Sequence, residues 1–235
     1  MSTHRRSLTI AAIALSLVAL SGCSALSDFT KADPKAAATT ATTAAPILDS
    51  QFTKDGTFQS HEEIDGLDFV YTLWPTKSTP RTNDWFPLGN KYFSFTFQAY
   101  DLDQEIRDPF KTKRRVYLDY IRVTSATVSA SGVSETPYEL SGRAKRLTWD
   151  PQPLTSKYGM MITNPKGSFE IRNQEIGPLA MDTYGINLTF EATVYIQRSA
   201  GSKKYEEETI RQVVPIAIFA SKTPTVVTEI PVDAN

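Results

Sequence analysis

The clearest pattern in the chain is a strict alternation of apolar and polar side chains, which is typical of half-buried β-strands. Within residues 91–101 the apolar positions are Phe93, Phe95, Phe97 and Ala99. Within residues 186–197 they are Leu188, Phe190, Ala192, Val194 and Ile196. We therefore predict two long strands, each with one face in the core and one face in water.

A hairpin follows the second of these strands. Residues 205–214 again read as a strand, and the intervening residues 199–203 contain Gly201, which suits the loop of a hairpin. Pro215 is expected to interrupt the last strand before residues 216–220, because proline cannot donate to a strand ladder.

Shorter strands are predicted between clusters of proline, glycine and asparagine, at residues 57–60, 68–74, 116–129, 143–148, 159–163 and 169–172. No stretch of ten residues has the apolar spacing of a helix. Many strands without crossover helices indicate an all-β fold, a single antiparallel β-sandwich, for which immunoglobulin-like and jelly-roll topologies both stay open. Trp74 and Trp149 lie on or just after strands and are expected in the core.

The first two dozen residues have a different character. His4, Arg5 and Arg6 form a basic head, and residues 8–20 form an apolar stretch of signal-peptide length that is short for a bilayer span. The end of this stretch and the three residues after it closely resemble the lipobox of bacterial lipoproteins: Leu20, Ser21, Gly22 and Cys23. This resemblance implies that Cys23 receives a diacylglyceryl group, becomes the mature N-terminus and anchors the protein to a membrane. An ordinary secretory signal with an incidental cysteine is the alternative.

Residues 24–46 are rich in alanine and threonine and lack the large apolar side chains that would stabilise an ordered structure. We expect a disordered tether. The predicted organisation is a signal peptide at residues 1–22, the lipidated cysteine and tether at 23–61, the β-sandwich at 62–222 and a frayed tail at 223–235.

Charge and cysteine content exclude some classes of protein. The formal net charge is −1, and a nucleic-acid-binding protein requires a concentrated basic face, so no nucleic-acid partner is expected. The chain has one cysteine. Acylation of that cysteine would leave no thiol for a disulfide or a thiolate metal site.

The usual motifs of enzymes are missing from the sequence. His61 is the one histidine that follows Cys23, and no zinc-protease helix, serine-hydrolase elbow, P-loop or dinucleotide-binding glycine pattern occurs. We expect His61 to be a surface residue, and we predict neither catalytic residues nor a cofactor.

The acidic residues after the first long strand are the weak candidates for chemistry. Asp101, Asp103 and Glu105 alternate, with Asp108 nearby, so they offer oxygen ligands to calcium or paired carboxylates to a glycosidase. A calcium loop of the EF-hand type beginning at Asp101 would need glycine and glutamate where Ile106 and Thr112 stand. Solvated loop carboxylates are the simpler interpretation.

An aromatic loop is the candidate ligand-binding site. Residues 75–90 are long for a strand connection and carry Asp84, Trp85 and Phe86. Exposed aromatic rings beside polar groups would suit sugars, and residues 116–123 resemble a strand of carbohydrate-binding jelly rolls. The alternative is that Trp85 and Phe86 fold inward and close one end of the sandwich.

These patterns predict a non-catalytic binding module, lipid-anchored at the outer face of the bacterial cytoplasmic membrane or in the cell envelope. Its partner would be a protein or glycan of the envelope. A carbohydrate-binding or carbohydrate-active protein and an accessory subunit of an integral membrane complex are the alternatives.

Overall fold

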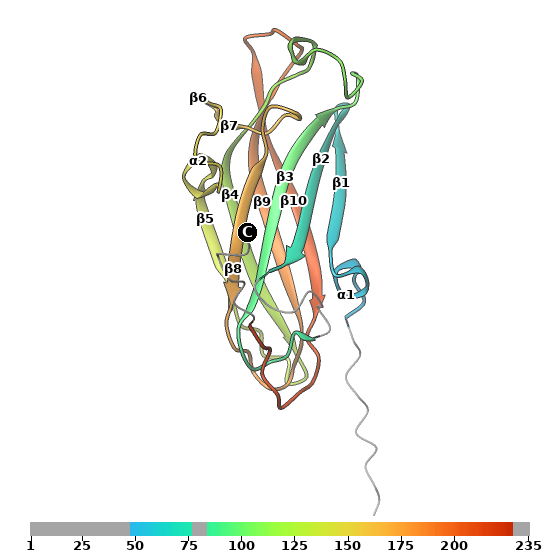
Figure 1. Ribbon diagram of the computed structural model, residues 1–235, viewed down its shortest axis with the longest axis vertical. Helices are drawn as coiled ribbons and strands as arrows, with labels where there is room; N and C mark the ends of the chain where they lie inside the picture. The colour runs from blue at the N-terminus through green and yellow to red at the C-terminus, as the bar shows by residue number, and fades with distance from the viewer. Residues whose placement is uncertain (1–47, 77–83, 228–235) are drawn as a thin grey trace, which may run out of the picture. The chain divides into compact units, whose positions relative to one another are not determined.

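Two antiparallel sheets form the protein (Figure 1). The computed structural model describes residues 48–76 and 84–227, all of which belong to one unit, Thr43–Asn235. The predicted signal peptide, Cys23 and residues 24–47 lie outside the described residues. The first sheet has four strands in the order β1 (Phe58–Ile64), β2 (Leu67–Pro75), β3 (Lys91–Asp101) and β8 (Phe169–Ile176).

The second sheet has the longer strands. Its order is β10 (Tyr205–Ala217), β9 (Thr183–Gln197), β4 (Val116–Ser129), β7 (Gly159–Met161) and β6 (Thr155–Ser156). A further strand, β5 (Glu139–Arg143), pairs with β4. The β9–β10 hairpin reaches the upper end of the view in Figure 1, while α1 (Gln51–Asp55) lies at the lower end.

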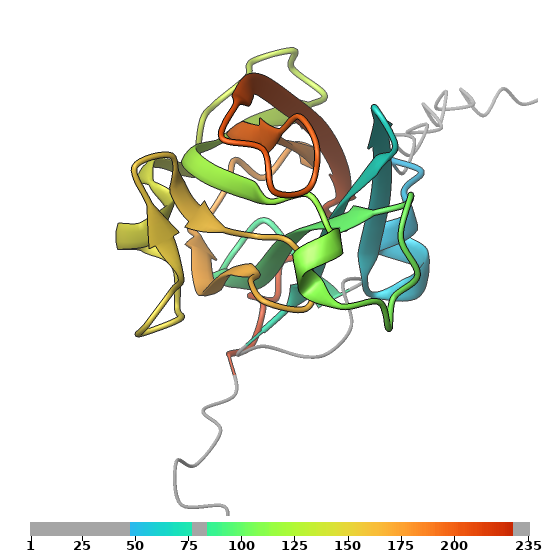
Figure 2. The same cartoon turned by 90° about the horizontal axis from the view of Figure 1, so that it is seen from above.

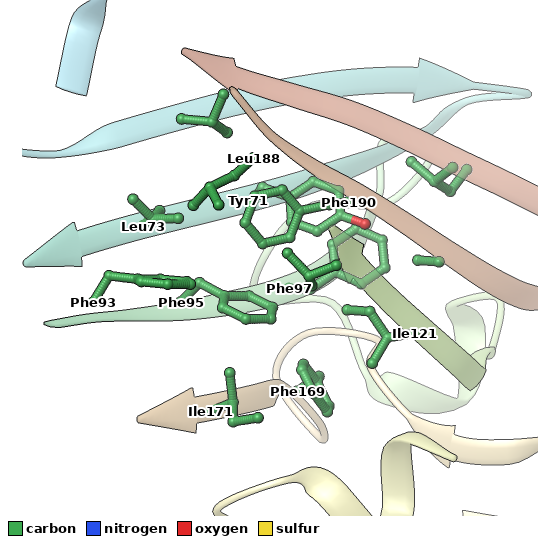
Figure 3. Close-up of a cluster of buried hydrophobic side chains, with 14 of the residues drawn as sticks. Tyr71, Leu73, Phe93, Phe95, Phe97, Ile121, Phe169, Ile171, Leu188 and Phe190 are labelled. Atoms are coloured by element: carbon green, nitrogen blue, oxygen red, sulfur yellow. The ribbon is translucent and has the colours of Figure 1, made fainter. Parts of the chain in front are cut away.

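The two sheets pack face to face, so the prediction of an all-β sandwich is confirmed. The alternating apolar residues predicted on β3 and β9 all lie in the core. Phe95 of β3 meets Phe190 of β9 edge to face, with ring centroids 4.9 Å apart, and Tyr71 stacks on Phe97 at 4.1 Å (Figure 3). The Phe95–Phe190 pair joins the two layers across the interior, whereas Tyr71 and Phe97 are neighbours within the four-stranded sheet.

Outside the sheets, the described residues include three short helices: α1, the 3₁₀ helix η2 (Phe110–Thr112) and α2 (Ala144–Leu147). The predicted strand at residues 143–148 is therefore wrong. Ala144, Lys145, Arg146 and Leu147 are strong helix formers, and one turn of helix buries Ala144 while Leu147 covers Gly142.

The sandwich begins before the predicted boundary at residue 62, which falls inside β1. Phe52 of α1 is fully buried and belongs to the core cluster. Leu48 is the first described residue, and its side chain packs against Gly185 near the start of β9. Residues 48–61, which the predicted domain division placed with the tether, thus supply a helix and the first part of a strand.

The predicted tail is also partly built into the fold. Thr225 is buried, and its backbone N–H donates to the carbonyl of Leu88 at 2.8 Å. Residues 228–235 lie outside the described range. Pro215 does not end β10, which runs on to Ala217, because β10 is an edge strand of its sheet and tolerates a missing N–H.

Candidate functional site

Residues 84–90 of the predicted aromatic loop turn their tryptophan into the core. Trp85 has no exposed area and its ring meets that of Phe52 at 5.3 Å and 61°. Asp84 and Phe86 are half-buried beside it. The assignment of Trp85 to an exposed ligand-binding loop is corrected, because this ring closes the core at the end of the sandwich near α1.

Two contacts hold this loop inward. The ammonium group of Lys91, also fully buried, donates to the carbonyls of Phe86, Pro87 and Gly89 at 3.0, 3.2 and 2.8 Å. Burial lowers the pKa of Lys91 to about 8. The second contact is the Thr225 hydroxyl, which donates to the Asp84 carbonyl and accepts from the Phe86 N–H. The loop is thereby a structural plug.

The acidic residues at the end of β3 and just after it form structural contacts. Asp101 accepts hydrogen bonds from the guanidinium group and the backbone N–H of Arg114, at 3.0 and 2.7 Å. Asp103 approaches the same guanidinium group at 3.4 Å, and the backbone carbonyl of Glu105 accepts from Lys113. Among the described residues, no group of three His, Cys, Asp or Glu side chains is arranged to hold a metal ion.

A small cavity of about 140 Å³ lies beside this segment. It is lined by Tyr100, Asp101, Leu102, Gln104, Ile106, Lys113 and Asn164.

His61 is exposed, as predicted, and its Nδ1 lies 2.7 Å from an Asp68 oxygen.

A cluster of tyrosines lies on the outer face of the six-stranded sheet, and we call Tyr117, Tyr158, Tyr195 and Tyr205 the tyrosine cluster. Tyr117 and Tyr195 are paired directly across β4 and β9. Tyr158 contacts the other three rings, with centroid distances of 4.3 Å to Tyr205, 5.1 Å to Tyr195 and 6.4 Å to Tyr117. The cluster thus joins three strands and one turn.

Gly159 is the reason that Tyr158 reaches this face. The turn at residues 157–158 joins β6 to β7, and Gly159 comes close to the backbone of β4 at Leu118 and Asp119. A Cβ atom on Gly159 would lie 2.2 Å from the Leu118 carbonyl oxygen, and its φ is +116°. Glycine alone permits this approach and conformation, which bring Tyr158 from the side of β4 onto the other rings.

Two phenol groups of the cluster have raised pKa values. The Tyr195 hydroxyl donates to Glu207 at 2.6 Å, and this hydrogen bond raises the pKa of Tyr195. Burial raises the pKa of Tyr205, an effect that the nearby Arg115 opposes. Tyr195 and Tyr205 therefore offer neutral rings with polar hydroxyl groups.

Four cationic residues lie beside the cluster in space or in sequence, and we call Arg115, Lys157, Lys203 and Lys204 the cationic rim. All four are exposed. Lys157 lies over the Tyr158 ring at 4.8 Å, and Lys203 and Lys204 immediately precede Tyr205. In the part of the chain that the structure describes, none of the four forms an ion pair with a carboxylate.

Sequence reasoning missed this site although part of its signal was present. Alternation placed Tyr195 on the wet face of its strand, but the pairing with Tyr117 depends on the register of β4 and β9. The position of Tyr158 depends on the close crossing at Gly159. Neither relationship is visible in a single strand.

Trp149 is an exposed aromatic residue outside the tyrosine cluster. It was predicted in the core, yet 59% of its surface is exposed, because it follows α2 and stacks against Arg172 outside the sheets. The distance from the Arg172 guanidinium carbon to the ring centroid is 5.0 Å.

Comparisons with known proteins leave the chain without a family assignment: no protein-family profile matches it, and no curated protein matches its sequence. Within residues 48–76 and 84–227, no helix is long and apolar enough to cross a membrane.

Proposed function

We propose that this protein is a lipid-anchored lipoprotein of the bacterial cell envelope that acts as a non-catalytic binding module. The observation that carries the proposal is the order of basic head, apolar stretch and lipobox ending at Cys23, placed upstream of a β-sandwich. Acyl chains on Cys23 would hold the protein at the outer face of the cytoplasmic membrane or elsewhere in the envelope.

The path of the chain through the sandwich supports a role in which the anchored protein holds a binding surface out towards its partner. The chain enters at Leu48 beside Gly185, whereas the tyrosine cluster lies ten residues further along β9, at Tyr195. At the rise of an extended strand, ten residues span about 33 Å. A surface at the Tyr195 end would therefore face away from the point where the anchored segment joins the sandwich.

Anchoring is tested by metabolic labelling with an alkyne analogue of palmitate, followed by fractionation of membranes. We expect the full chain to be labelled and membrane-bound, and the Cys23→Ala variant to be unlabelled. The matched control is Ser24→Ala, which leaves the lipobox intact. Equal labelling of the wild-type and Cys23→Ala chains would overturn the anchor.

A glycan-binding role is the second candidate, and Trp149 is the observation that favours it. An exposed indole ring beside polar groups suits the face of a sugar. Titration with soluble envelope glycan fragments, monitored by tryptophan fluorescence, would show a saturable change in the wild type that Trp149→Phe removes.

A further inference from the structure

Cations outnumber carboxylates around the tyrosine cluster. Asp119, whose charge acts on Tyr195, already pairs with Arg143. Glu207, which accepts a hydrogen bond from the Tyr195 hydroxyl group, is one carboxylate against the four cations of the rim. The four cations of the rim have no described carboxylate partner, so this face attracts an acidic ligand.

The ring geometry favours a protein over a glycan. The four ring pairs within the cluster are tilted by 33°, 39°, 39° and 59°, so no two rings form a flat platform for successive sugars. The rings cover part of one another and leave edges and hydroxyl groups at the surface. Protein interfaces use tyrosine and arginine in this way, because such rings combine apolar area with a hydrogen-bonding group.

The surface is also ordered before any partner binds. Tyr117 is buried, Tyr195 is hydrogen-bonded to Glu207, and Tyr158 packs against three rings. Side chains that are already fixed lose less conformational entropy on binding.

We propose that the tyrosine cluster and the cationic rim form the docking surface for an acidic segment of a partner protein. This inference rests on the proposed role as a binding module and names the chemistry of the partner. The rim would steer the acidic segment to the sheet, and the tyrosine rings would supply the buried centre of the contact.

The first test places a photo-crosslinker, benzoylphenylalanine, at Thr209 of the full chain in living cells. Thr209 is exposed on the same face, two residue pairs away from Glu207 and Tyr195. The control position is Val133, which is 63% exposed beyond the opposite end of β4. We expect a protein adduct from Thr209 that Val133 does not give, attached to a segment rich in Asp and Glu.

The second test uses a synthetic peptide of the crosslinked segment and the full chain carrying Cys23→Ala. Reversing two rim charges, Lys203→Glu with Lys204→Glu, is expected to weaken binding by at least about tenfold. Lys145→Glu with Lys222→Glu gives the same change in net charge at exposed residues that are not part of the rim and should leave the affinity unchanged. A peptide with lysine in place of its acidic residues should bind the rim-reversed chain.

Four results would overturn the docking surface: adducts to glycan or lipid alone, an adduct to a segment without acidic residues, no adduct above the Val133 control, or equal affinity of the two charge-reversed chains. Palmitate labelling of the same cells reports on the anchor separately. An unlabelled chain that still gives the Thr209 adduct would refute the anchor and leave the docking surface standing.

Discussion

The ammonium nitrogen of Lys91 lies 2.8 Å from the carbonyl oxygen of Gly89, two residues earlier in the chain. Together with the carbonyls of Phe86 and Pro87, this contact makes Lys91 the internal support of the loop that buries Trp85. Replacement by methionine, which keeps the length of the side chain, would leave three carbonyls without their donor. We expect Lys91→Met to lower the free energy of unfolding by about 2–4 kcal/mol in urea titrations.

The same lysine gives the stability a pH dependence of known sign. Its pKa is about 8 in the folded protein, against an ordinary value of 10.5. Between these values the unfolded chain holds a proton that the folded chain has released, so raising the pH stabilises the fold. We expect the free energy of unfolding of the wild type, relative to Lys91→Met, to increase from pH 8 to pH 9.5, by at most about 1.4 kcal/mol per pH unit. If the difference in unfolding free energy between the wild type and Lys91→Met does not change with pH, the hydrogen bonds from the ammonium group to the three carbonyls offset the cost of desolvating it.

Thr225 gives a test of the segment that follows β10. Its hydroxyl group bridges the Asp84 carbonyl and the Phe86 N–H, at 3.0 and 2.9 Å. Thr225→Val keeps the shape and removes both bonds, so we expect a loss of about 1–3 kcal/mol in unfolding free energy. Thr225→Ser retains the hydroxyl group and is the control. If the valine variant is as stable as the serine variant, this segment does not hold the loop.

Asp101 and Asp103 both approach Arg114 but differ in burial. The Asp101 side chain is 2% exposed and the Asp103 side chain is 73% exposed. Asp101→Asn leaves the buried guanidinium group without its main counter-charge and should cost about 3–5 kcal/mol in thermal or chemical unfolding. Asp103→Asn should cost less than about 1 kcal/mol. Equal effects would mean that Asp101 and Arg114 do not form the structural pair described above.

Features that depend on local backbone geometry could be predicted from the sequence, whereas features that depend on contacts between distant segments could not. Alternation of Phe93, Phe95 and Phe97 located β3 with its observed bounds, because the side chains of a strand alternate between the core and water. The bounds of β4 were also predicted correctly. These are local properties of the backbone, and the pattern of one segment contains them.

The candidate site depends on contacts between distant segments. Trp85 is buried through Phe52, Lys91 and Thr225, and the last of these lies 139 residues beyond Phe86, with which it bonds. A loop aromatic residue has no periodic pattern, so its sequence fits a binding surface and a plug equally well. The tyrosine cluster was missed for the same reason, because it is formed by the register of two strands and the reach of one turn.

Gly159 links the stability of the fold to the proposed docking surface. A methyl group there would meet the Leu118 carbonyl at 2.2 Å, and the φ of +116° is strained for any other residue. Gly159→Ala should therefore cost about 2–4 kcal/mol and move Tyr158 away from Tyr205 and Tyr195. The near-ultraviolet circular dichroism of the tyrosines should weaken, and affinity for the acidic segment should fall with it. Gly177→Ala, where no atom lies within 4 Å of the added methyl group, is the control and should behave as the wild type. A stable Gly159→Ala variant with an unchanged tyrosine signal would contradict the role of this glycine in placing Tyr158.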